Sequence, residues 1–137
     1  MDVPAKNVKD LAAYLKQNPG KVSFGSAGNG STQHLAFELF MHMAGTQALH
    51  VPYKGSTQAM SDVLSGLVPV MFSPASSVLP HINSGKLVAL ATTSNRHTPL
   101  IAVPTLEESG VANFNVSLWF GILAPKGTDS QVVNKLS

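Results

Sequence analysis

The sequence predicts an α/β domain in which a mostly parallel sheet carries helices on both faces. Short apolar segments of strand length alternate with segments of helical periodicity, and glycine or proline marks most of the boundaries between them. Alternation of this kind with short connections is typical of parallel sheets. Ligands of such sheets bind beyond the carboxyl ends of the strands, so the loops of interest follow Phe24, Tyr53, Phe72 and Thr92.

The first two helices are predicted from apolar residues three and four positions apart. Val8, Leu11, Ala12 and Leu15 keep this spacing, and Asn18-Pro19-Gly20 ends the helix. The clearest helix covers residues 31–44 and is stopped by a glycine. The apolar residues expected on its buried side are Leu35, Leu39 and Met43, with Ala36 and Phe40 beside them.

Shorter elements complete the expected fold. The remaining helices and their signals are residues 56–64, closed by Gly66; a helix capped by Ser76 or Ser77 that runs through Ser84 to Gly85; one that begins at Thr105 with Glu107 and Glu108 in its first turn; and one that begins within residues 129–137. The expected strands are residues 21–25, 48–53, 68–73 and 87–93, the last being the most apolar, followed by a long extended run at residues 114–124.

Length and composition indicate one ordinary domain and exclude several classes of protein. The chain has 137 residues, of which 44% are hydrophobic and only 12% charged, against about 25% charged residues in typical soluble domains. Much of the surface must therefore be uncharged or covered by another molecule. The basic residues are scattered singly, so nucleic-acid binding is not expected. The chain contains no cysteine, which excludes disulfides and thiolate metal sites.

The sequence shows neither of two kinds of apolar segment that would point to a membrane. No apolar run approaches the roughly 18 residues of a membrane span. The opening MDVPAKNVKD lacks the apolar centre of a signal peptide.

A glycine-rich stretch, FGSAGNGST, follows the first expected strand and is the main candidate for a binding site. We call residues 25–32 the glycine loop. Its glycines can adopt positive φ, and the helix start that follows presents free N–H groups and a partial positive charge to an anion. A nucleotide loop would need a lysine before Ser31, and the dinucleotide fingerprint fails at Gln33. The loop therefore suits a weaker anion such as a carboxylate, although the same residues would also make a plain strand–helix turn with a Ser/Thr cap.

Metal and catalytic sites are poorly supported. His34, Glu38 and His42 lie on one helical face, but the histidines are about 12 Å apart along the axis, too far for one metal. His34 alone lies where it would line the mouth of a pocket. The acidic residues fall in helices or caps, the Gly-x-Ser-x-Gly elbow is absent, and little is left to act as a general base. We therefore expect no enzyme activity, no metal and no cofactor.

Small uncharged donors are instead frequent at the expected strand ends. They are Ser26, Asn29, Ser31, Ser73, Ser76, Ser77, Thr92, Thr93 and Ser94. Such donors converging on a cleft would bind a ligand without chemistry. The simpler alternative is that they only finish strands and begin helices.

Five stretches together resemble the solute receptors of tripartite tricarboxylate transporters, the Bug receptor family. They are KVSFGSAGNGSTQHLAFELF, HVPYKGSTQAMSDVLSG, VPVMFSPASSVLPHINSGKLVALATTS, VPTLEESG and SLWFGILAPKGT, in the family's order and over essentially the whole chain. The resemblance implies a type II periplasmic-binding-protein-like lobe, a periplasmic location, no catalytic residues, a small carboxylate ligand and a membrane permease as partner. His34 matches the family's histidine after the loop, without direct contact to ligand being assigned to it.

On the family's pattern, backbone amides and ordered waters at loops from both lobes of a two-lobe receptor hold one ligand carboxylate, and this chain provides the second lobe's contribution. The ligand-binding residues this implies are Ser26, Ala27, Gly28, Asn29, Gly30, Ser31 and Thr32, flanked by Ser73, Ala75 and Thr92. The implied organisation is a leading helix and hinge segment at 1–20, the ligand-binding lobe at 21–117, and a crossing strand with a cut-short helix at 118–137. Two departures stand out: full receptors are about twice this length, and many relatives have aspartate where this chain has Ser73, which favours a carboxylate ligand lacking an amine.

Two further expectations concern other readings of the chain. The alternative function is that of a phosphate-ester or nucleotide-binding enzyme that uses Gly25 to Thr32, and the third possibility is a structural remnant that binds nothing.

We also expect self-association of the isolated lobe, because apolar hinge residues would be exposed. They are Trp119, Phe120, Ile122 and Leu123.

Overall fold

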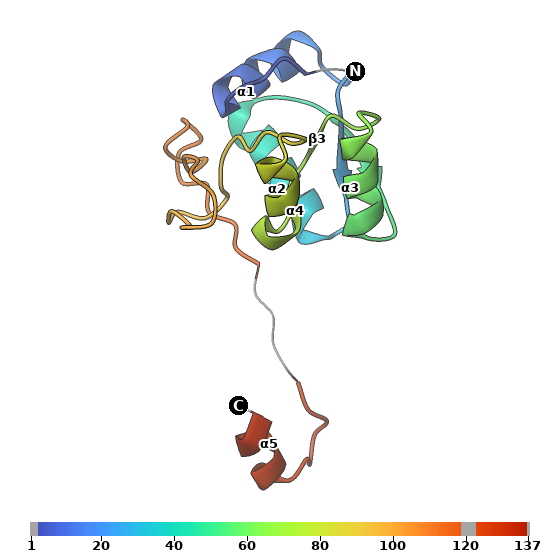
Figure 1. Cartoon of the computed structure of the whole chain (residues 1–137), viewed down its shortest axis with the longest axis vertical. Helices are drawn as coiled ribbons and strands as arrows, with labels where there is room; N and C mark the ends of the chain where they lie inside the picture. The colour runs from blue at the N-terminus through green and yellow to red at the C-terminus, as the bar shows by residue number, and fades with distance from the viewer. Residues whose placement is uncertain (1–2, 119–122, 137) are drawn as a thin grey trace.

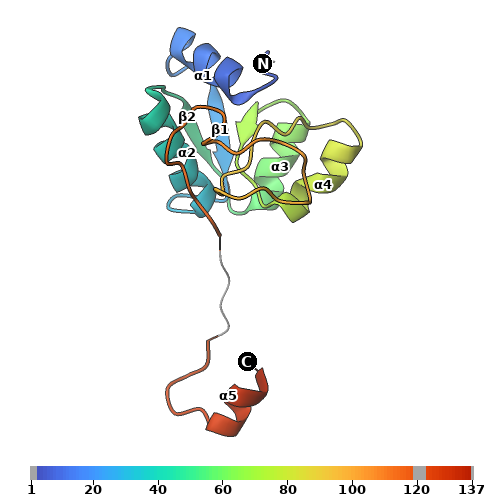
Figure 2. The same cartoon turned by 90° about the vertical axis from the view of Figure 1, so that its left-hand side faces the viewer.

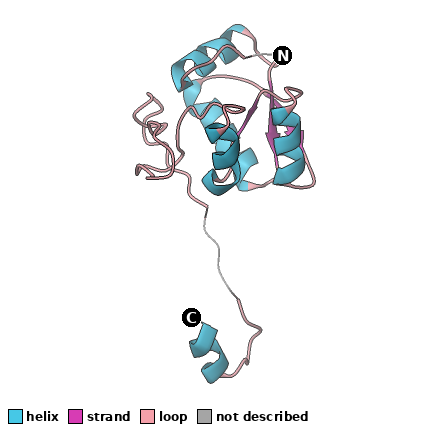
Figure 3. Cartoon of the chain, in the orientation of Figure 1, coloured by secondary structure: helices cyan, strands magenta, loops and turns pink. Residues whose placement is uncertain are grey.

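The centre of the fold is a parallel sheet of three short strands in the order β2-β1-β3 (Figures 1 and 3). The computed structural model describes residues 3–118 and 123–136. The strands are β1 (Ser23–Ser26), β2 (Leu49–Pro52) and β3 (Val70–Met71). Both neighbours of β1 run parallel to it, with Phe24 opposite His50 on one side and Val70 on the other. The carboxyl end of the central strand, and the loop that follows it, therefore lie between the carboxyl ends of the two neighbouring strands.

Helices cover both faces of this sheet, as the sequence predicted. They are α1 (Val8–Gln17), α2 (Thr32–Ala44), α3 (Ser56–Leu64), α4 (Ala75–Asn83) and α5 (Ser130–Leu136). The β1–α2–β2 and β2–α3–β3 connections cross the sheet in opposite directions, so right-handed crossovers put α2 and α3 on opposite faces. Phe24 stacks on Phe37 of α2, whereas a Cβ on the next residue, Gly25, would lie 3.5 Å from Ala59 of α3. Figure 2 shows the strands between these two helices.

The helix α1 closes one end of the core, with the boundaries that its capping residues predict. The Asn7 side chain accepts a hydrogen bond from the backbone N–H of Asp10, and Asn18 ends the helix. Val8, Leu11 and Leu15 are buried in the same cluster as β1 and α2. The expected helical face of this segment is therefore confirmed.

The buried face of α2 differs from the one expected. Ser31 caps the helix and Gly45 ends it in the left-handed conformation, as predicted. The buried residues are Ala36, Phe37, Phe40 and Met41, so Ala36 and Phe40 are confirmed. The prediction was wrong for the other three residues, because Leu35, Leu39 and Met43 are 58%, 37% and 37% exposed. Apart from the face of His34, Glu38 and His42, this helix is apolar, and the face that carries Phe37 and Phe40 packs on the sheet because it fills more volume there.

The later strands are shorter than expected. Only Val70–Met71 of residues 68–73 forms a strand, and residues 87–93 form none. The pairing of that segment within the described residues is one bridge between Thr92 and Thr105. A strand needs a neighbour along its length to bond its N–H and C=O groups. Without one, Val88 remains 71% exposed despite its apolar sequence context.

Two expected helix starts also need correction. α4 begins at Ala75 after Pro74, whose fixed φ suits a helix start, so Ser76 and Ser77 lie in the first turn and neither caps the helix. At Thr105 the chain forms turns in place of a helix. The local signal was nevertheless sound, because Thr105 and Glu108 each accept a hydrogen bond from the other's backbone N–H.

The C-terminal part begins against the body and ends away from it. The backbone N–H of Val116 donates to the Thr93 carbonyl at 3.0 Å, and residues 114–118 form no strand. The expected apolar residues Trp119, Phe120 and Ile122 fall outside the described residues, while Leu123 is 92% exposed. The expected last helix is confirmed as α5, which lies apart from the sheet in both Figures 1 and 2. In the described part of the chain, no helix has the length and apolar character to cross a membrane.

Candidate functional site

The glycine loop joins the carboxyl end of β1 to the start of α2. Gly28 has φ +128° and Gly30 has φ +75°, conformations that residues with a side chain rarely adopt. A Cβ on Gly28 would also lie 3.2 Å from the carbonyl oxygen of Tyr53, which ends the neighbouring β2 segment. The local fold therefore requires glycine here, as the sequence indicated.

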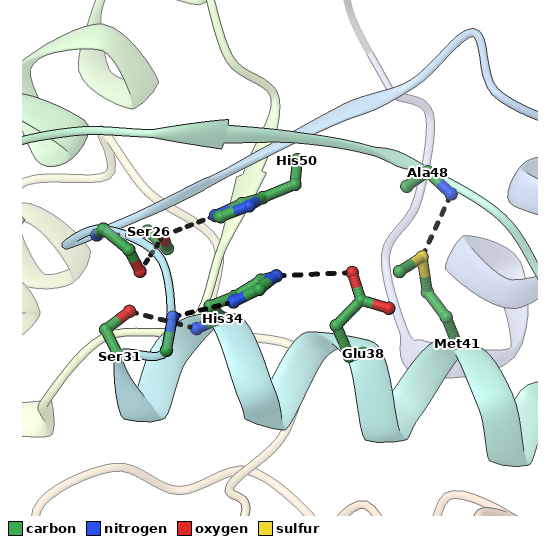
Figure 4. Close-up of polar contacts among 9 residues, drawn as sticks. Ser26, Ser31, His34, Glu38, Met41, Ala48 and His50 are labelled. Carbon is green, nitrogen blue, oxygen red and sulfur yellow. Dashed lines mark hydrogen bonds and ion pairs between the residues drawn. The ribbon is translucent and has the colours of Figure 1, made fainter.

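Four backbone N–H groups of this region donate hydrogen bonds within the protein. Gly28 donates to the Ser26 hydroxyl oxygen at 3.1 Å, and Ser31 donates to the Gly28 carbonyl at 3.2 Å. Gly30 donates to Nδ1 of His34 at 3.1 Å, and His34 itself donates to the Ser31 hydroxyl oxygen at 3.3 Å (Figure 4). These bonds fix the shape of the loop and make the four N–H groups unavailable to a ligand while they last.

Four other N–H groups of this region have no hydrogen-bond partner among the described residues. They belong to Ala27 and Asn29 in the loop and to Thr32 and Gln33 in the first turn of α2. The first N–H groups of a helix lack intrahelical acceptors and lie at the positive end of its dipole. The side chain of Asn29 is exposed and Thr32 is partly exposed. This part of the loop has the donors and the field that a carboxylate needs.

Ser26 lies below the loop and is fully buried. Its hydroxyl oxygen is 2.6 Å from Nε2 of His50 and is also bonded to both the N–H and the carbonyl of Gly28. Its hydrogen-bonding capacity is thus used inside the protein. The geometry gives Ser26 the part of an anchor for the loop, and its contact with a ligand stays a prediction.

Behind the loop, the rings of His34 and His50 stack with centroids 3.8 Å apart and planes inclined by 8°. Figure 4 shows both rings between β2 and α2, with Glu38 beside His34. Nε2 of His34 is 3.5 Å from Oε1 of Glu38. Burial, and secondly the neighbouring His34, lowers the pKa of His50 below the usual histidine value, while Glu38 acts in the opposite direction.

Sequence reasoning singled out His34 but missed His50. The residue is 24 positions from Ser26 and lies within an apolar strand segment. Only the parallel register, which sets Phe24 opposite His50, brings it under the loop. The one sign available in the sequence was that a polar residue, His50, stands in the middle of the apolar stretch ALHVPY.

Ser73, Ala75 and Thr92, the flanking residues implied by the family pattern, lie on other segments. Ser73 and Ala75 follow β3, which neighbours β1, so they leave the sheet at the same edge as the glycine loop. Thr92 lies at the bridge to Thr105. The hydroxyl oxygens of Ser73 and Thr92 are buried without a hydrogen-bond partner among the described residues, and no hydrogen bond there joins them to the loop.

Two surface hollows lie elsewhere. An open hollow of about 470 Å³ is lined by the C-terminal ends of α1 and α2, and another of about 360 Å³ lies between α4 and residues 100–103. Neither includes a predicted ligand residue. No group of three metal-ligating side chains converges anywhere in the described ranges 3–118 and 123–136. The candidate site on this chain is therefore the partly exposed loop surface around Asn29 and Thr32, outside both hollows.

Comparison with known proteins identifies what this arrangement is similar to. A family model described as the tripartite tricarboxylate transporter family receptor, TctC, matches residues 1–137. Protein BugT of Bordetella pertussis is 44% identical over 124 residues, which cover 90% of this chain and 38% of BugT.

Two solved structures add the fold and a ligand. The R. palustris protein Rpa4515 with adipate has a TM-score of 0.93 and 35% identity, over 98% of this chain and 45% of that chain. MatC (Rpa3494) from Rhodopseudomonas palustris with bound malate has a TM-score of 0.88 and 27% identity, over 98% of this chain and 46% of that chain. The chain thus spans less than half the length of each of these proteins.

Proposed function

Because the chain belongs to the tripartite tricarboxylate transporter receptor family, we propose that it is the ligand-binding lobe of a periplasmic receptor for a small organic carboxylate. The family consists of solute receptors rather than enzymes. The proposal concerns the ligand, the location and the partners, and it rests on the glycine loop.

The observation that carries the proposal is the set of unpaired N–H groups of Asn29, Thr32 and Gln33. They combine neutral donors with the positive end of α2, which suits a carboxylate and offers no cation to a phosphate ester. The buried, unpartnered hydroxyls of Ser73, after β3, and of Thr92, at the bridge to Thr105, are further donors. Two family neighbours were solved with adipate and with malate, which are both dicarboxylates.

The proposed receptor has a second lobe outside this chain, since each solved neighbour is more than twice as long. In this arrangement, residues 1–20 lead through the hinge into the lobe, residues 21–117 form the lobe, and residues 118–137 cross toward the other lobe. Closure of the two lobes would complete the grip on the ligand, and the closed receptor would dock on the membrane permease of its transporter.

A proline at the start of α2 tests directly whether the unpaired N–H groups there bind the carboxylate. Thr32→Pro removes one unpaired N–H group, yet proline is well tolerated at the first position of a helix. The preceding Ser31 has ψ 156°, an extended conformation compatible with a following proline. We expect adipate affinity, measured by isothermal calorimetry, to fall by about tenfold, the value of one hydrogen bond to a charged group.

The matched control is Ser56→Pro, at the first position of α3, where Gly55 is also extended with ψ 161°. It should leave adipate affinity unchanged, and Thr32→Ala separates loss of the hydroxyl from loss of the N–H group. The measurements belong on this chain and on a two-lobe receptor. Equal affinities of Thr32→Pro and Ser56→Pro would remove the helix start from the site, and a thermal shift with ATP and magnesium but none with dicarboxylates would favour the phosphate-ester alternative.

Ser73, two residues after the end of β3, bears on which carboxylate is bound. The family resemblance implies an aspartate at this position in many receptors, able to pair with a ligand ammonium group, whereas Ser73 carries no charge. The proposed ligand therefore lacks an amine. Succinate should bind more tightly than aspartate, and Ser73→Asp should narrow or reverse the difference. Equal or tighter binding of aspartate by the unaltered chain would contradict this assignment.

The exposed apolar residues near the C-terminal crossing segment support self-association of this chain. Leu118 is 47% exposed and Leu123 is 92% exposed. Light scattering should show oligomers that grow with concentration and are reduced in Leu118→Glu and Leu123→Glu. A monodisperse monomer at high concentration would rule this association out.

A further inference from the structure

We infer that His34 couples the shape of the glycine loop to its own protonation, so that binding of a carboxylate at the loop takes up a proton. The part about the ligand rests on the proposed function. The part about the loop stands on the contacts of His34 alone.

The contacts of His34 define which of its ring nitrogens carries the proton. Nδ1 accepts a hydrogen bond from the N–H group of Gly30 at 3.1 Å, so Nδ1 has no proton in this arrangement. The proton of the neutral ring is then on Nε2, which faces Oε1 of Glu38 at 3.5 Å. The loop geometry thus depends on one tautomer of one neutral histidine.

The neighbours of His34 hold its ring in place. From β2, the ring of His50 stacks on it at 3.8 Å, and from β1 the ring of Phe24 lies 6.3 Å away in a similar plane. The titratable groups facing His34 are Glu38 on its own helix and His50 on β2, while β1 contributes the apolar Phe24. The side chain is only 21% exposed, and the stack with His50 sets the plane of its ring, while the Gly30 hydrogen bond sets the orientation of the ring in that plane.

Protonation of His34 changes the donors at the loop. With a proton on both nitrogens, Nδ1 no longer accepts the Gly30 N–H group, and two donors face each other. A carboxylate oxygen that accepts from both relieves this conflict and gains a charged partner. The bound state therefore favours the protonated ring, which by linkage means that acid strengthens binding.

His50 holds the start of the glycine loop and does not itself take up a proton in this inference. It is bonded to the buried Ser26, and a second charge in a ring stacked at 3.8 Å on a protonated His34 would be repelled. Ser26 keeps the start of the loop in place while Gly30, further along, changes partner. Ser26 and His50 thus anchor the loop, whereas the contact between Gly30 and His34 responds to protonation.

The first test needs no ligand. Long-range nitrogen–proton NMR spectra of this chain should show the Nε2–H tautomer of His34 at about pH 8, and the Gly30 amide signal should shift together with the His34 ring as the pH falls. A His34 ring protonated on Nδ1 at high pH, or a Gly30 amide that does not follow the ring, would overturn the inference.

The second test uses adipate and two substitutions on α2. In His34→Asn, the side-chain oxygen replaces Nδ1 as acceptor for Gly30 but takes up no proton. We expect adipate affinity of the unaltered chain to be about tenfold higher at pH 5.5 than at pH 8, with His34→Asn much less dependent on pH. The control His42→Asn lies exposed in the last turn of α2 and should keep the full dependence.

Calorimetry in buffers of different ionisation enthalpy should also detect uptake of a proton with adipate near pH 6.5, absent in His34→Asn. A pH dependence that survives in His34→Asn, or binding without proton uptake, would overturn the coupling. If adipate and other organic acids fail to bind at any pH, the proposed function fails, while the NMR titration still decides whether His34 controls the loop.

Discussion

The ring of Phe24 stacks on the ring of Phe37, with centroids 4.0 Å apart and planes inclined by 5°. This pair joins the central strand to α2 at the base of the glycine loop, and both side chains are almost completely buried. Replacing Phe37 by alanine leaves a large cavity, so Phe37→Ala should lower the free energy of unfolding by about 3–5 kcal/mol in urea titrations.

The control for this prediction lies two residues earlier on the same helix. Leu35 is 58% exposed, so Leu35→Ala should change the free energy of unfolding by less than about 0.5 kcal/mol. Similar losses in Phe37→Ala and Leu35→Ala would mean that α2 packs with the face expected from the sequence, contrary to the structure.

Tyr53 and Asp62 predict a loss of stability in alkali. The Tyr53 hydroxyl donates a 2.6 Å hydrogen bond to the Asp62 carboxylate, which raises the pKa of Tyr53 to about 12. A pKa raised on folding stabilises the protein below the unfolded value near 10, and this stabilisation is lost as the pH rises from 10 through 12. Tyr53→Phe should cost about 1–3 kcal/mol at neutral pH and flatten the stability curve in that window.

Tyr14→Phe is the matched control, since the Tyr14 hydroxyl makes no hydrogen bond within the described part of the chain. It should leave both the neutral stability and the alkaline slope nearly unchanged. Chemical denaturation between about pH 8 and 12 measures both quantities. An alkaline slope that persists unaltered in Tyr53→Phe would show that another group causes it.

Two glycines of the loop differ in what a side chain would meet. Gly28→Ala forces φ +128° on alanine and brings its Cβ to 3.2 Å from the Tyr53 carbonyl oxygen. Gly30→Ala requires φ +75° but meets no atom within 4 Å. Gly28→Ala should therefore cost about 3 kcal/mol of unfolding free energy and Gly30→Ala about 1 kcal/mol, by urea titration. The reverse order would contradict the described path of the loop.

Glu108 predicts a loss of stability in acid. A hydrogen bond from the Thr105 backbone N–H, followed by one from His97, lowers the pKa of Glu108 below 4.5. A pKa lowered on folding stabilises the protein above the unfolded value, and this contribution disappears as the pH falls below 4.5. Glu108→Gln should lose stability at neutral pH and show a shallower acid decline in thermal melts. The neighbouring Glu107→Gln should keep the decline, and a decline unaffected by Glu108→Gln would exclude this carboxyl as its source.

Helix boundaries were the part of the fold most accessible to sequence reasoning. Ser31 and Gly45 bound α2, and Asn18 follows α1, because capping groups bond to the backbone a few residues away. Local contacts of this kind depend on short stretches of sequence. The glycine loop was predictable for the same reason, since strand, glycines and cap follow one another directly.

Features that depend on distant segments were not predictable. Because α2 is apolar on most sides, its own sequence pattern does not decide whether Leu35 or Phe37 is buried. Packing against Phe24 of the sheet buries Phe37. Residues 87–93 have the composition of a strand, but in the described part of the chain only Thr92 and Thr93 at their end bond to neighbouring segments, so no strand forms along their length. His50 joins the site only through the register of β1 and β2.

The burial of Ser26 has an evolutionary consequence. The loop is fastened at its root inside the core, whereas Asn29 at its tip is exposed and forms no side-chain hydrogen bond within the described residues. In the proposed receptor, substitution at the tip would therefore change ligand preference with little penalty to folding. The same scaffold would then serve for different acids while its buried root stays unchanged.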